Sequence, residues 1–310
     1  MSPTAQAPET VDIDLTARWG LSGPRTLRRL ADGQDDRPYE LFGVRPLGPL
    51  IGAEITGVDL GAPVTPELHA ELNRALLEHK VVFFRRQRIT NAQHRDFARL
   101  WGELETHPFL PQGDTADVVR FAKDADLSGY ENIWHTDVTW RANPALGSVL
   151  RLTEVPPHGG GDTLWADAGA AYDNLPDDVK ARIDGLTAVH DFMPSFGRFL
   201  PPELAAAKQA EFPPVAHPIV RTHPETGRKS LFVNAIFTTH IPDLPADEGE
   251  ELLRYLFRQA FVPEYQVRWR WEKDDIAFWD NRATWHYASS DYHPHVRVAE
   301  RASIVGDVPR

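Results

Sequence analysis

The segment IWHTDVTW, residues 133–140, places a histidine and an aspartate two positions apart within an otherwise mostly apolar run. Side chains at positions i and i+2 of a β-strand point to the same face of the sheet. A strand over this segment would therefore direct His135 and Asp137 toward one point. A buried imidazole and a buried carboxylate need partners, because burial of unpaired polar groups is costly. A metal ion is one such partner, although a pair this short also arises by chance.

The composition limits the classes of protein to be considered. The chain has 310 residues, of which 42% are hydrophobic, enough for one domain with a sizeable core. Its net charge of −12 argues against general nucleic-acid binding, which needs a basic face. We expect no membrane span, because no run of about 18 apolar residues occurs. The N-terminal residues lack the basic and apolar blocks of a secretory signal, so we expect a cytoplasmic protein.

The absence of cysteine restricts the chemistry further. Disulfides, thiolate nucleophiles and iron–sulfur clusters are excluded. Any metal ion must be held by histidine, aspartate or glutamate side chains.

The order of expected elements predicts a mostly β fold with flanking helices, a β-sandwich or jelly roll. Two amphipathic helices are expected early in the chain, at 63–80, with a Thr–Pro start signal at Thr65, and at 89–104, capped by Thr90 or Asn91. Residues 1–40 are expected to form a partly ordered N-terminal extension and residues 41–310 a single domain. Later helices are expected near 165–185 and at 247–261. Strands are expected within 44–60 and at 81–85, 118–122, 133–140, 147–155, 222–234, 265–271, 276–280 and 301–307.

A third metal ligand is available in WDNRATWHYASSDY, residues 279–292, where His286 follows an expected strand. Two histidines and one carboxylate on one face of an octahedron leave three positions open, as in the non-haem Fe(II) oxygenases. A zinc hydrolase is the alternative interpretation, since zinc uses the same side chains but needs only one open position. His286 is one of 13 histidines, so this assignment also needs support from elsewhere.

Two arginines supply that support. Arg297 and Arg301 lie four positions apart in RVAERASIVGD, residues 297–307, and share one face of a strand. Two guanidinium groups beside a metal suit carboxylates or sulfonates, which each bind through two parallel hydrogen bonds. Taken singly, each arginine is better explained by a surface ion pair, and it is their position between apolar residues close to His286 that favours the functional interpretation. Upstream, GGGDTLWAD (159–167) forms a glycine turn before Thr163, whose hydroxyl would add a neutral hydrogen bond.

Together these segments resemble the taurine dioxygenase family of Fe(II)/2-oxoglutarate-dependent dioxygenases. The resemblance runs from about residue 44 to the end of the chain, with the order and spacing of the motifs preserved. It implies a double-stranded β-helix, the jelly-roll fold also called cupin-like. The motifs that carry it are GAEITGVDL (52–60), HKVVFFRRQ (79–87), WGELETHPF (101–109), WHTDVTW (134–140), GGDTLWAD (160–167), FVNAIFTTHI (232–241), VRWRWEKDDIAFWDNRATWHYASSDY (267–292) and RVAERASIVGDVP (297–309).

The resemblance also implies the roles of individual residues. Fe(II) and the cosubstrates 2-oxoglutarate and O₂ are the implied cofactors. The implied iron ligands are His135, Asp137 and His286. The implied contacts of 2-oxoglutarate are Thr163, Arg297 and Arg301, and those of the substrate are His107, the backbone N–H of Val138, Arg301 and Phe237.

The implied activity is hydroxylation of a C–H bond in a small anionic substrate, with release of succinate and CO₂. A sulfonate such as taurine is the first candidate. An alkyl sulfate, an aryloxyalkanoate or a larger biosynthetic acid is the alternative. A zinc hydrolase or a protein that only senses 2-oxoglutarate would belong to a different class. The resemblance further implies self-association as a dimer or tetramer.

Four positions depart from the pattern of the taurine enzymes: Leu110, Glu131, Glu300 and Trp285. The first replaces an aromatic hydroxyl and the second an asparagine, and both positions are expected to affect the shape and polarity of the substrate site. None of the four changes an implied ligand of iron or of 2-oxoglutarate. The departures therefore weaken the assignment of taurine itself and leave the cofactors as implied.

Overall fold

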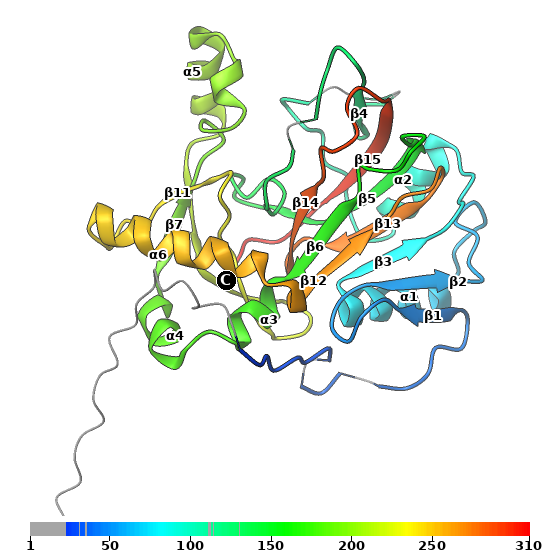
Figure 1. The fold of residues 1–310 in the computed structure, drawn as a ribbon, viewed down its shortest axis with the longest axis horizontal. Coiled ribbons are helices and arrows are strands. Elements are labelled where there is room, and N and C mark those ends of the chain that lie inside the picture. Colours follow the sequence, from blue (N-terminus) through cyan, green and yellow to red (C-terminus); the bar gives the residue numbers. More distant parts are fainter. Residues whose placement is uncertain (1–22, 31, 35, 111–112, 114, 130) are drawn as a thin grey trace, which may run out of the picture.

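The computed structural model describes residues 23–310 except 31, 35, 111, 112, 114 and 130. A large sheet with strand order β1-β2-β3-β13-β5-β15-β4 runs through the molecule, and a smaller sheet with order β12-β6-β14 faces it (Figure 1). The strands of the large sheet are β1 (Gly43–Pro46), β2 (Ala53–Thr56), β3 (Val81–Phe84), β13 (Ile276–Asp280), β5 (Ala145–Glu154), β15 (Arg297–Val305) and β4 (Val119–Lys123). Those of the smaller sheet are β12 (Gln266–Trp269), β6 (Thr163–Asp167) and β14 (Thr284–Ala288).

Aromatic side chains hold the two sheets together. The Phe83 ring of the large sheet stacks on Trp269 of the smaller one, with 4.1 Å between ring centroids. Trp165 of the smaller sheet contacts both Phe83 and Trp279 of the large sheet. Such pairs contribute about 0.5–1.5 kcal/mol each beyond the area they bury. Two facing sheets with helices around them confirm the expected jelly roll.

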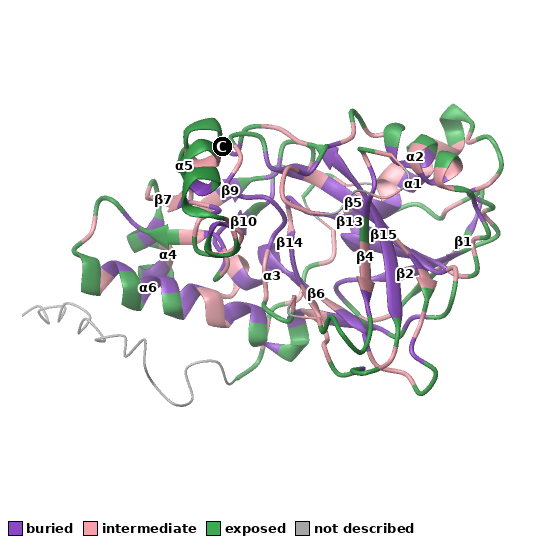
Figure 2. Ribbon diagram, turned by 90° about the horizontal axis from the view of Figure 1, so that it is seen from above, coloured by how far each residue is buried: buried purple, intermediate pink, exposed green. Residues whose placement is uncertain are grey.

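The remaining elements surround this sandwich. A three-stranded sheet and a strand pair extend it, and the outer sides of α4, α5 and α6 are exposed (Figure 2). The extra strands are β11 (Thr238–His240), β7 (Thr187–His190), β8 (Val215–Pro218), β10 (Lys229–Leu231) and β9 (Val220–Thr222). The helices are α1 (Pro66–His79), α2 (Asn91–Arg99), α3 (Ala168–Asp173), α4 (Asp177–Ile183), α5 (Pro202–Glu211), α6 (Ala246–Arg258) and the short 3-10 helices η1 (Gly197–Phe199), η2 (Gln259–Phe261) and η3 (Pro263–Tyr265).

The apolar run of β3 is explained by burial of both its faces. Val81 and Phe83 belong to the core between the sheets, whereas Val82 and Phe84 belong to a second core beneath α1 and α2. Alternate side chains of a strand point to opposite faces, so a strand covered on both sides is apolar at every position. The expectation of a buried strand at 81–85 is confirmed.

The two early helices begin at the side chains that their sequences indicate. The hydroxyl of Thr65 accepts a hydrogen bond from the backbone N–H of Leu68, at 3.2 Å, at the start of α1. In α2 the cap is Thr90 rather than Asn91, because Thr90 and Gln93 bond each other's backbone N–H groups reciprocally. α1 ends at Lys80, which adopts a left-handed backbone conformation (φ 62°).

Several expected boundaries were wrong. The segment 133–140 is not a strand: it makes one isolated bridge, at His135, and then turns. Residues 222–234 form only β10 and the end of β9, separated by a turn. By contrast, the helices expected near 165–185 are confirmed as α3 and α4, which follow β6. The last strand starts at Arg297, four residues before the segment expected at 301–307, as the expected shared face of Arg297 and Arg301 requires. It is this long because β15 is paired on both sides by β4 and β5.

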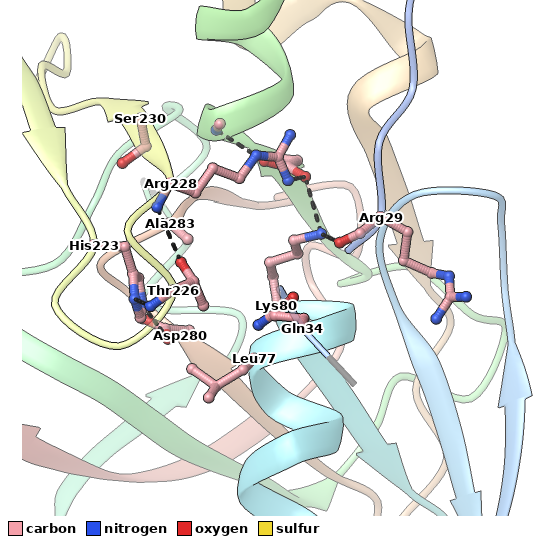
Figure 3. A pocket seen from close by; sticks show the side chains of 12 residues that line it. Arg29, Gln34, Leu77, Lys80, His223, Thr226, Arg228, Ser230, Asp280 and Ala283 are labelled. Carbon is pink, nitrogen blue, oxygen red and sulfur yellow. Dashed lines mark hydrogen bonds and ion pairs between the residues drawn. The ribbon is translucent and has the colours of Figure 1, made fainter. Parts of the chain in front are cut away.

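The described part of the N-terminal extension is bonded to the domain. The Nζ of Lys80 donates to the backbone carbonyl of Arg29 at 2.7 Å and lies 3.4 Å from the Asp167 carboxylate (Figure 3). Thr26 and Asn174 exchange two hydrogen bonds, of 2.8 and 2.9 Å. Residues 1–22 lie outside the described residues, and the boundary near residue 40 stays a prediction.

A buried histidine on α2 predicts loss of stability in acid. Burial, opposed by a 2.9 Å hydrogen bond from Nε2 to the Val149 carbonyl, lowers the pKa of His94 to about 4. Between about pH 4 and 6.5 the unfolded chain then binds a proton at His94 that the folded chain does not. The contribution of the buried neutral His94 to the free energy of unfolding is therefore lost as the pH falls. From pH 7 to pH 5 we expect the free energy of unfolding to fall about 1–2 kcal/mol more in the natural protein than in His94→Gln. Urea unfolding at both pH values measures this, and equal decreases would contradict it.

Within the described ranges, no helix has the length and apolar character needed to cross a lipid bilayer.

Candidate active site

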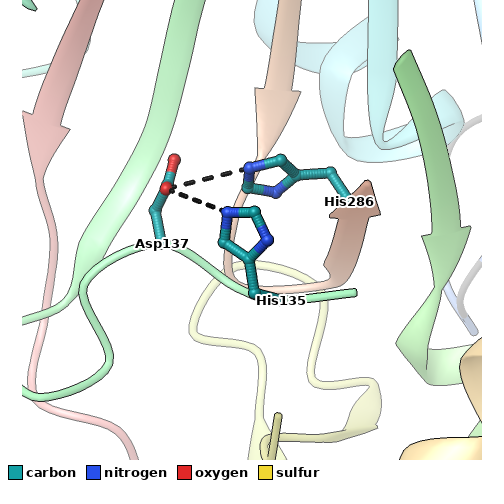
Figure 4. Close-up of side chains that lie close together, drawn as sticks. All are labelled: His135, Asp137 and His286. Atoms are coloured by element: carbon teal, nitrogen blue, oxygen red, sulfur yellow. Dashed lines mark ion pairs between the residues drawn. The ribbon is translucent and has the colours of Figure 1, made fainter. Parts of the chain in front are cut away.

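Three polar side chains from two separate segments converge at one end of the sandwich. His135 and His286 face each other across an isolated antiparallel bridge, with backbone N–H to carbonyl distances of 3.0 and 2.7 Å in the two directions. Asp137 follows two residues later, and its Oδ1 lies 3.8 Å from Nε2 of His135 and 3.7 Å from Nε2 of His286. Figure 4 shows both imidazole rings turned toward the carboxylate. One potential ligand atom from each residue lies within 4.8 Å of the other two.

Side-chain hydrogen bonds take the place of a neighbouring strand around Asp137. The Asn281 amide donates to the Asp137 carbonyl at 3.1 Å and accepts from the Asp137 N–H at 2.9 Å. The Thr136 hydroxyl donates to the Thr284 carbonyl at 3.0 Å. Val138 then has φ 48°, a conformation that β-branched residues rarely adopt and that often marks functional sites. Convergence of His135 and Asp137 therefore comes from a bridge followed by a held turn, not from the face of a continuous strand.

The electrostatic environment keeps Asp137 ionised. Burial alone would raise the pKa of this carboxyl, but the positive charge of the Arg301 guanidinium is the largest of the opposing effects that hold the pKa below its usual range. Nη1 of Arg301 lies 2.8 and 2.9 Å from the two carboxylate oxygens. The sequence indicated that Arg301 lies near the site but gave no sign of this direct contact.

Both histidines can offer the lone pair of a ring nitrogen to a metal ion. Burial lowers the pKa of His135 and of His286, so both rings are neutral near pH 7. Nδ1 of His135 lies 2.7 Å from the Ile133 carbonyl, which places its proton there and leaves Nε2 free of one. Two imidazole nitrogens and one carboxylate oxygen in a buried cluster fit a divalent transition metal such as Fe(II).

A cavity of about 280 Å³ opens beside these three side chains. Arg297 and Arg301 both line it from one face of β15, and Thr163 lines it from β6. Nε of Arg297 donates to the Gly161 carbonyl at 3.0 Å, whereas its buried Nη2 has no partner in the part of the chain that the structure describes. The hydroxyl of Thr163 accepts from the Trp271 indole N–H at 3.0 Å and keeps its own proton for donation.

The expected substrate residues line the same cavity. His107, Val138 and Phe237 are all buried there. Burial, with the positive charge of Arg301, lowers the pKa of His107 to about 3, so this ring is neutral. Nδ1 of His107 accepts from the Phe109 backbone N–H at 3.2 Å, which places the ring proton on Nε2 as a donor.

Three contributors to the site were missed at the level of sequence. Asn281 lies within a quoted motif but was assigned no role, although its amide fixes the backbone of Asp137. Ser148 lies 3.4 Å from the Asp137 carboxylate. Lys123 lines the cavity from the end of β4 and lies 2.8 Å from Glu131. Single polar residues within strands or at their ends carry no spacing signal, so nothing in the sequence alone distinguished them.

Comparison with known proteins agrees with this geometry. A family model described as "Taurine catabolism dioxygenase TauD, TfdA family" matches residues 43–303. An alkylsulfatase of Acinetobacter baylyi is 36% identical over 280 residues, covering 87% of this chain and 87% of that protein. An alpha-ketoglutarate-dependent sulfate ester dioxygenase of Pseudomonas putida is 36% identical over 284 residues, covering 88% of this chain and 92% of that protein.

A solved structure is similar over nearly the same length. The crystal structure of a taurine dioxygenase from Burkholderia xenovorans matches with a TM-score of 0.75 and 38% sequence identity, covering 87% of this chain and 91% of that chain. The match of the family model over most of the chain and the identities above 30% show the family. The chain therefore belongs to the TauD, TfdA family and is an Fe(II)- and 2-oxoglutarate-dependent dioxygenase.

Proposed function

We propose that this dioxygenase oxidises an organosulfur anion, a sulfate ester or a sulfonate, whose tail is uncharged and apolar. We further propose that His135, Asp137 and His286 hold its Fe(II). When bound, Fe(II) with 2-oxoglutarate and O₂ supplies the oxidising power that hydroxylates a C–H bond, with release of succinate and CO₂. The protein's part is to bind, orient and shield the reactants.

The cosubstrate is assigned to the basic wall of the cavity. Arg297 is the buried cation whose Nη2 lacks a partner among the described residues, and a carboxylate would satisfy it. The Thr163 hydroxyl, on the neighbouring sheet, is positioned to donate to the same carboxylate. Arg301 lies on the same face of β15 but is already bound to Asp137. We therefore assign the distal carboxylate of 2-oxoglutarate to Arg297 and Thr163, and place Arg301 between cosubstrate and substrate.

The anionic head of the substrate is assigned to the donors near the metal site. His107 offers a neutral Nε2–H, and Val138 is held in a turn directly after Asp137. Arg301 adds a positive charge beside both. These groups gather at the metal end of the cavity, so the carbon next to the sulfate or sulfonate would be the one oxidised.

The tail is assigned to the apolar remainder of the cavity. Most of its walls there are side chains without charge, and the charged one among them, Arg198, is a cation that would not pair with an ammonium group. The uncharged ones are Leu110, Pro194, Phe196, Phe199, Ile236 and Phe237. Among the residues that the structure describes, Asp137 and Glu131 are the carboxylates that line the cavity, and Glu131 is paired with Lys123. The ammonium group of taurine would lose its water against these walls without gaining a carboxylate partner, at a considerable cost. The cavity therefore favours the alkyl sulfate alternative over taurine, in agreement with the names of the two relatives.

For a sulfate ester, the products follow from where the hydroxyl is placed. Hydroxylation of the carbon attached to the ester oxygen gives a hemiacetal sulfate. The bond between this carbon and the ester oxygen then breaks as the new hydroxyl loses its proton, which leaves an aldehyde and inorganic sulfate. In the same turnover 2-oxoglutarate becomes succinate and CO₂. A sulfonate hydroxylated at the corresponding carbon would leave an aldehyde and sulfite.

A chain-length series tests this assignment. We expect kcat/KM to rise about fourfold per added methylene from ethyl sulfate to hexyl sulfate, because each buried methylene contributes about 0.8 kcal/mol. Taurine should be slower than hexanesulfonate. Succinate, aldehyde and sulfate or sulfite are measured in parallel. Fastest turnover with taurine would overturn the apolar-tail proposal, and the absence of succinate with any organosulfur anion would overturn the substrate class.

The oligomeric state stays a prediction. A dimer or tetramer is expected from the resemblance, and analytical ultracentrifugation would measure it.

A further inference from the structure

A charged pair lies in the wall of the active-site cavity in addition to the groups already assigned. Nζ of Lys123 lies 2.8 Å from a carboxylate oxygen of Glu131. The side chains are 8% and 28% exposed, so this pair is far more enclosed than an ordinary surface ion pair. Both residues line the cavity. An ion pair in this position is not needed to hold the metal ligands, which have their own contacts.

The pair lies next to the arginine assigned to 2-oxoglutarate. Lys123 on β4 is directly opposite Arg297 on β15 in the antiparallel register. Side chains at opposite positions of two strands are neighbours on one face. Three cations, Lys123, Arg297 and Arg301, therefore line one wall of the cavity.

The loop that carries Glu131 is fastened beside Arg297. The Ser290 hydroxyl donates to the Gly129 carbonyl at 2.7 Å, and the nearby Tyr292 ring lies 5.8 Å from the Arg297 guanidinium. Burial lowers the pKa of Arg297, and the negative charge of Glu131 is among those that oppose this effect. Glu131 is thus close enough to Arg297 for its carboxylate to attract the guanidinium.

These contacts create a competition for one cation. A carboxylate on the protein and the distal carboxylate of 2-oxoglutarate would both be attracted to Arg297. In the structure the Glu131 carboxylate is bound to Lys123, and Arg297 donates to the Gly161 carbonyl. Loss of Lys123 would remove the ammonium group that lies 2.8 Å from the Glu131 carboxylate, and Arg297 is the cation directly opposite that ammonium group on the neighbouring strand.

We infer that Lys123 binds Glu131 and so keeps Arg297 available to the carboxylate of 2-oxoglutarate. Lys123 and Glu131 are positioning residues for the cosubstrate, acting through Arg297. The inference rests on the proposed function, because it takes Arg297 as the residue that binds 2-oxoglutarate. It also gives Glu131, one of the departures from the taurine enzymes, a specific role.

The test is calorimetric titration of 2-oxoglutarate into the Mn(II)-loaded full chain without substrate. We expect Lys123→Met to weaken 2-oxoglutarate binding about tenfold, since Glu131 would turn to Arg297. Glu131→Gln should bind as tightly as the natural protein or several-fold more tightly, because a competing carboxylate is gone. The double variant should return to within about twofold of Glu131→Gln.

Rescue by the second substitution separates this role from a general loss of structure. A double variant as weak as Lys123→Met would overturn the inference, as would unchanged binding in Lys123→Met. The matched control is Lys208→Met, which removes an ion pair of similar length, 2.7 Å to Glu211, on α5 outside the cavity, and should change nothing. Binding by the natural protein with no response to these variants would overturn this inference alone. No binding by the Mn(II)-loaded natural protein would overturn the proposed function with it.

Discussion

Asp137→Ala should bind Mn(II) or Fe(II) more than about a hundredfold more weakly than the natural protein, because loss of a group that merely hydrogen-bonds to a metal ligand commonly costs about 10–100-fold. The substitution removes the one anionic donor of the set. It also leaves the buried guanidinium of Arg301 without the carboxylate that now lies 2.8 Å away. An unpaired positive charge beside the empty position would repel a cation, so the loss should exceed that of a neutral ligand. Succinate formation should fall to background.

The measurement is metal titration by calorimetry, with succinate release as a second readout. Asp137→Asn is the informative companion, because it keeps the shape of the side chain and leaves the Asn281 contacts to the backbone in place. Asp184→Ala is a suitable control, since Asp184 is exposed and its ion pair with Lys229 lies outside the cavity. Natural metal affinity in Asp137→Ala would remove this residue from the ligand set.

Arg297→Ala should weaken the binding of 2-oxoglutarate by roughly a hundredfold or more, since truncating one partner of a buried charge pair costs about 2–5 kcal/mol. Its KM for the cosubstrate should rise in parallel. Metal affinity should stay close to natural, because Arg297 donates its hydrogen bond to Gly161 rather than to a metal-site residue. Arg297→Lys should recover part of the lost affinity, because lysine restores the positive charge but lacks the planar guanidinium that binds a carboxylate through two hydrogen bonds. The dissociation constant is measured on the Mn(II)-loaded protein.

A matched arginine supplies the control for this variant. Arg254 on α6 is exposed and pairs with Glu250 at 2.7 Å. Arg254→Ala should leave the Kd for 2-oxoglutarate unchanged. A natural Kd in Arg297→Ala would assign the cosubstrate carboxylate to another group on the basic wall.

Local patterns predicted the parts of the fold that local physics determines. The caps at Thr65 and Thr90 and the doubly buried strand β3 follow from hydrogen-bonding side chains and from apolar residues close in sequence. The segment 133–140 has the composition of a strand but forms a turn. Its backbone at Asp137 is bonded by Asn281, 144 positions away, and a contact of that range leaves no local signal.

For the candidate site too, the sequence predicted some features and not others. Residue types and motif order predicted that the three candidate metal ligands meet and that the two arginines share one face of β15. They did not predict that Arg301 binds Asp137 or that Lys123 binds Glu131. Each of these pairs joins different elements through side chains whose types are common on protein surfaces. These pairs can be recognised as parts of the site only once the structure shows that all four residues line the cavity.

The most direct test of the proposed iron site is a crystal structure of the chain grown without oxygen, with Mn(II) and 2-oxoglutarate. We predict a metal ion bound to Nε2 of His135, Nε2 of His286 and the Asp137 carboxylate, with the far carboxylate of 2-oxoglutarate on Arg297. A metal ion held elsewhere, or 2-oxoglutarate bound away from Arg297, would contradict the assignment.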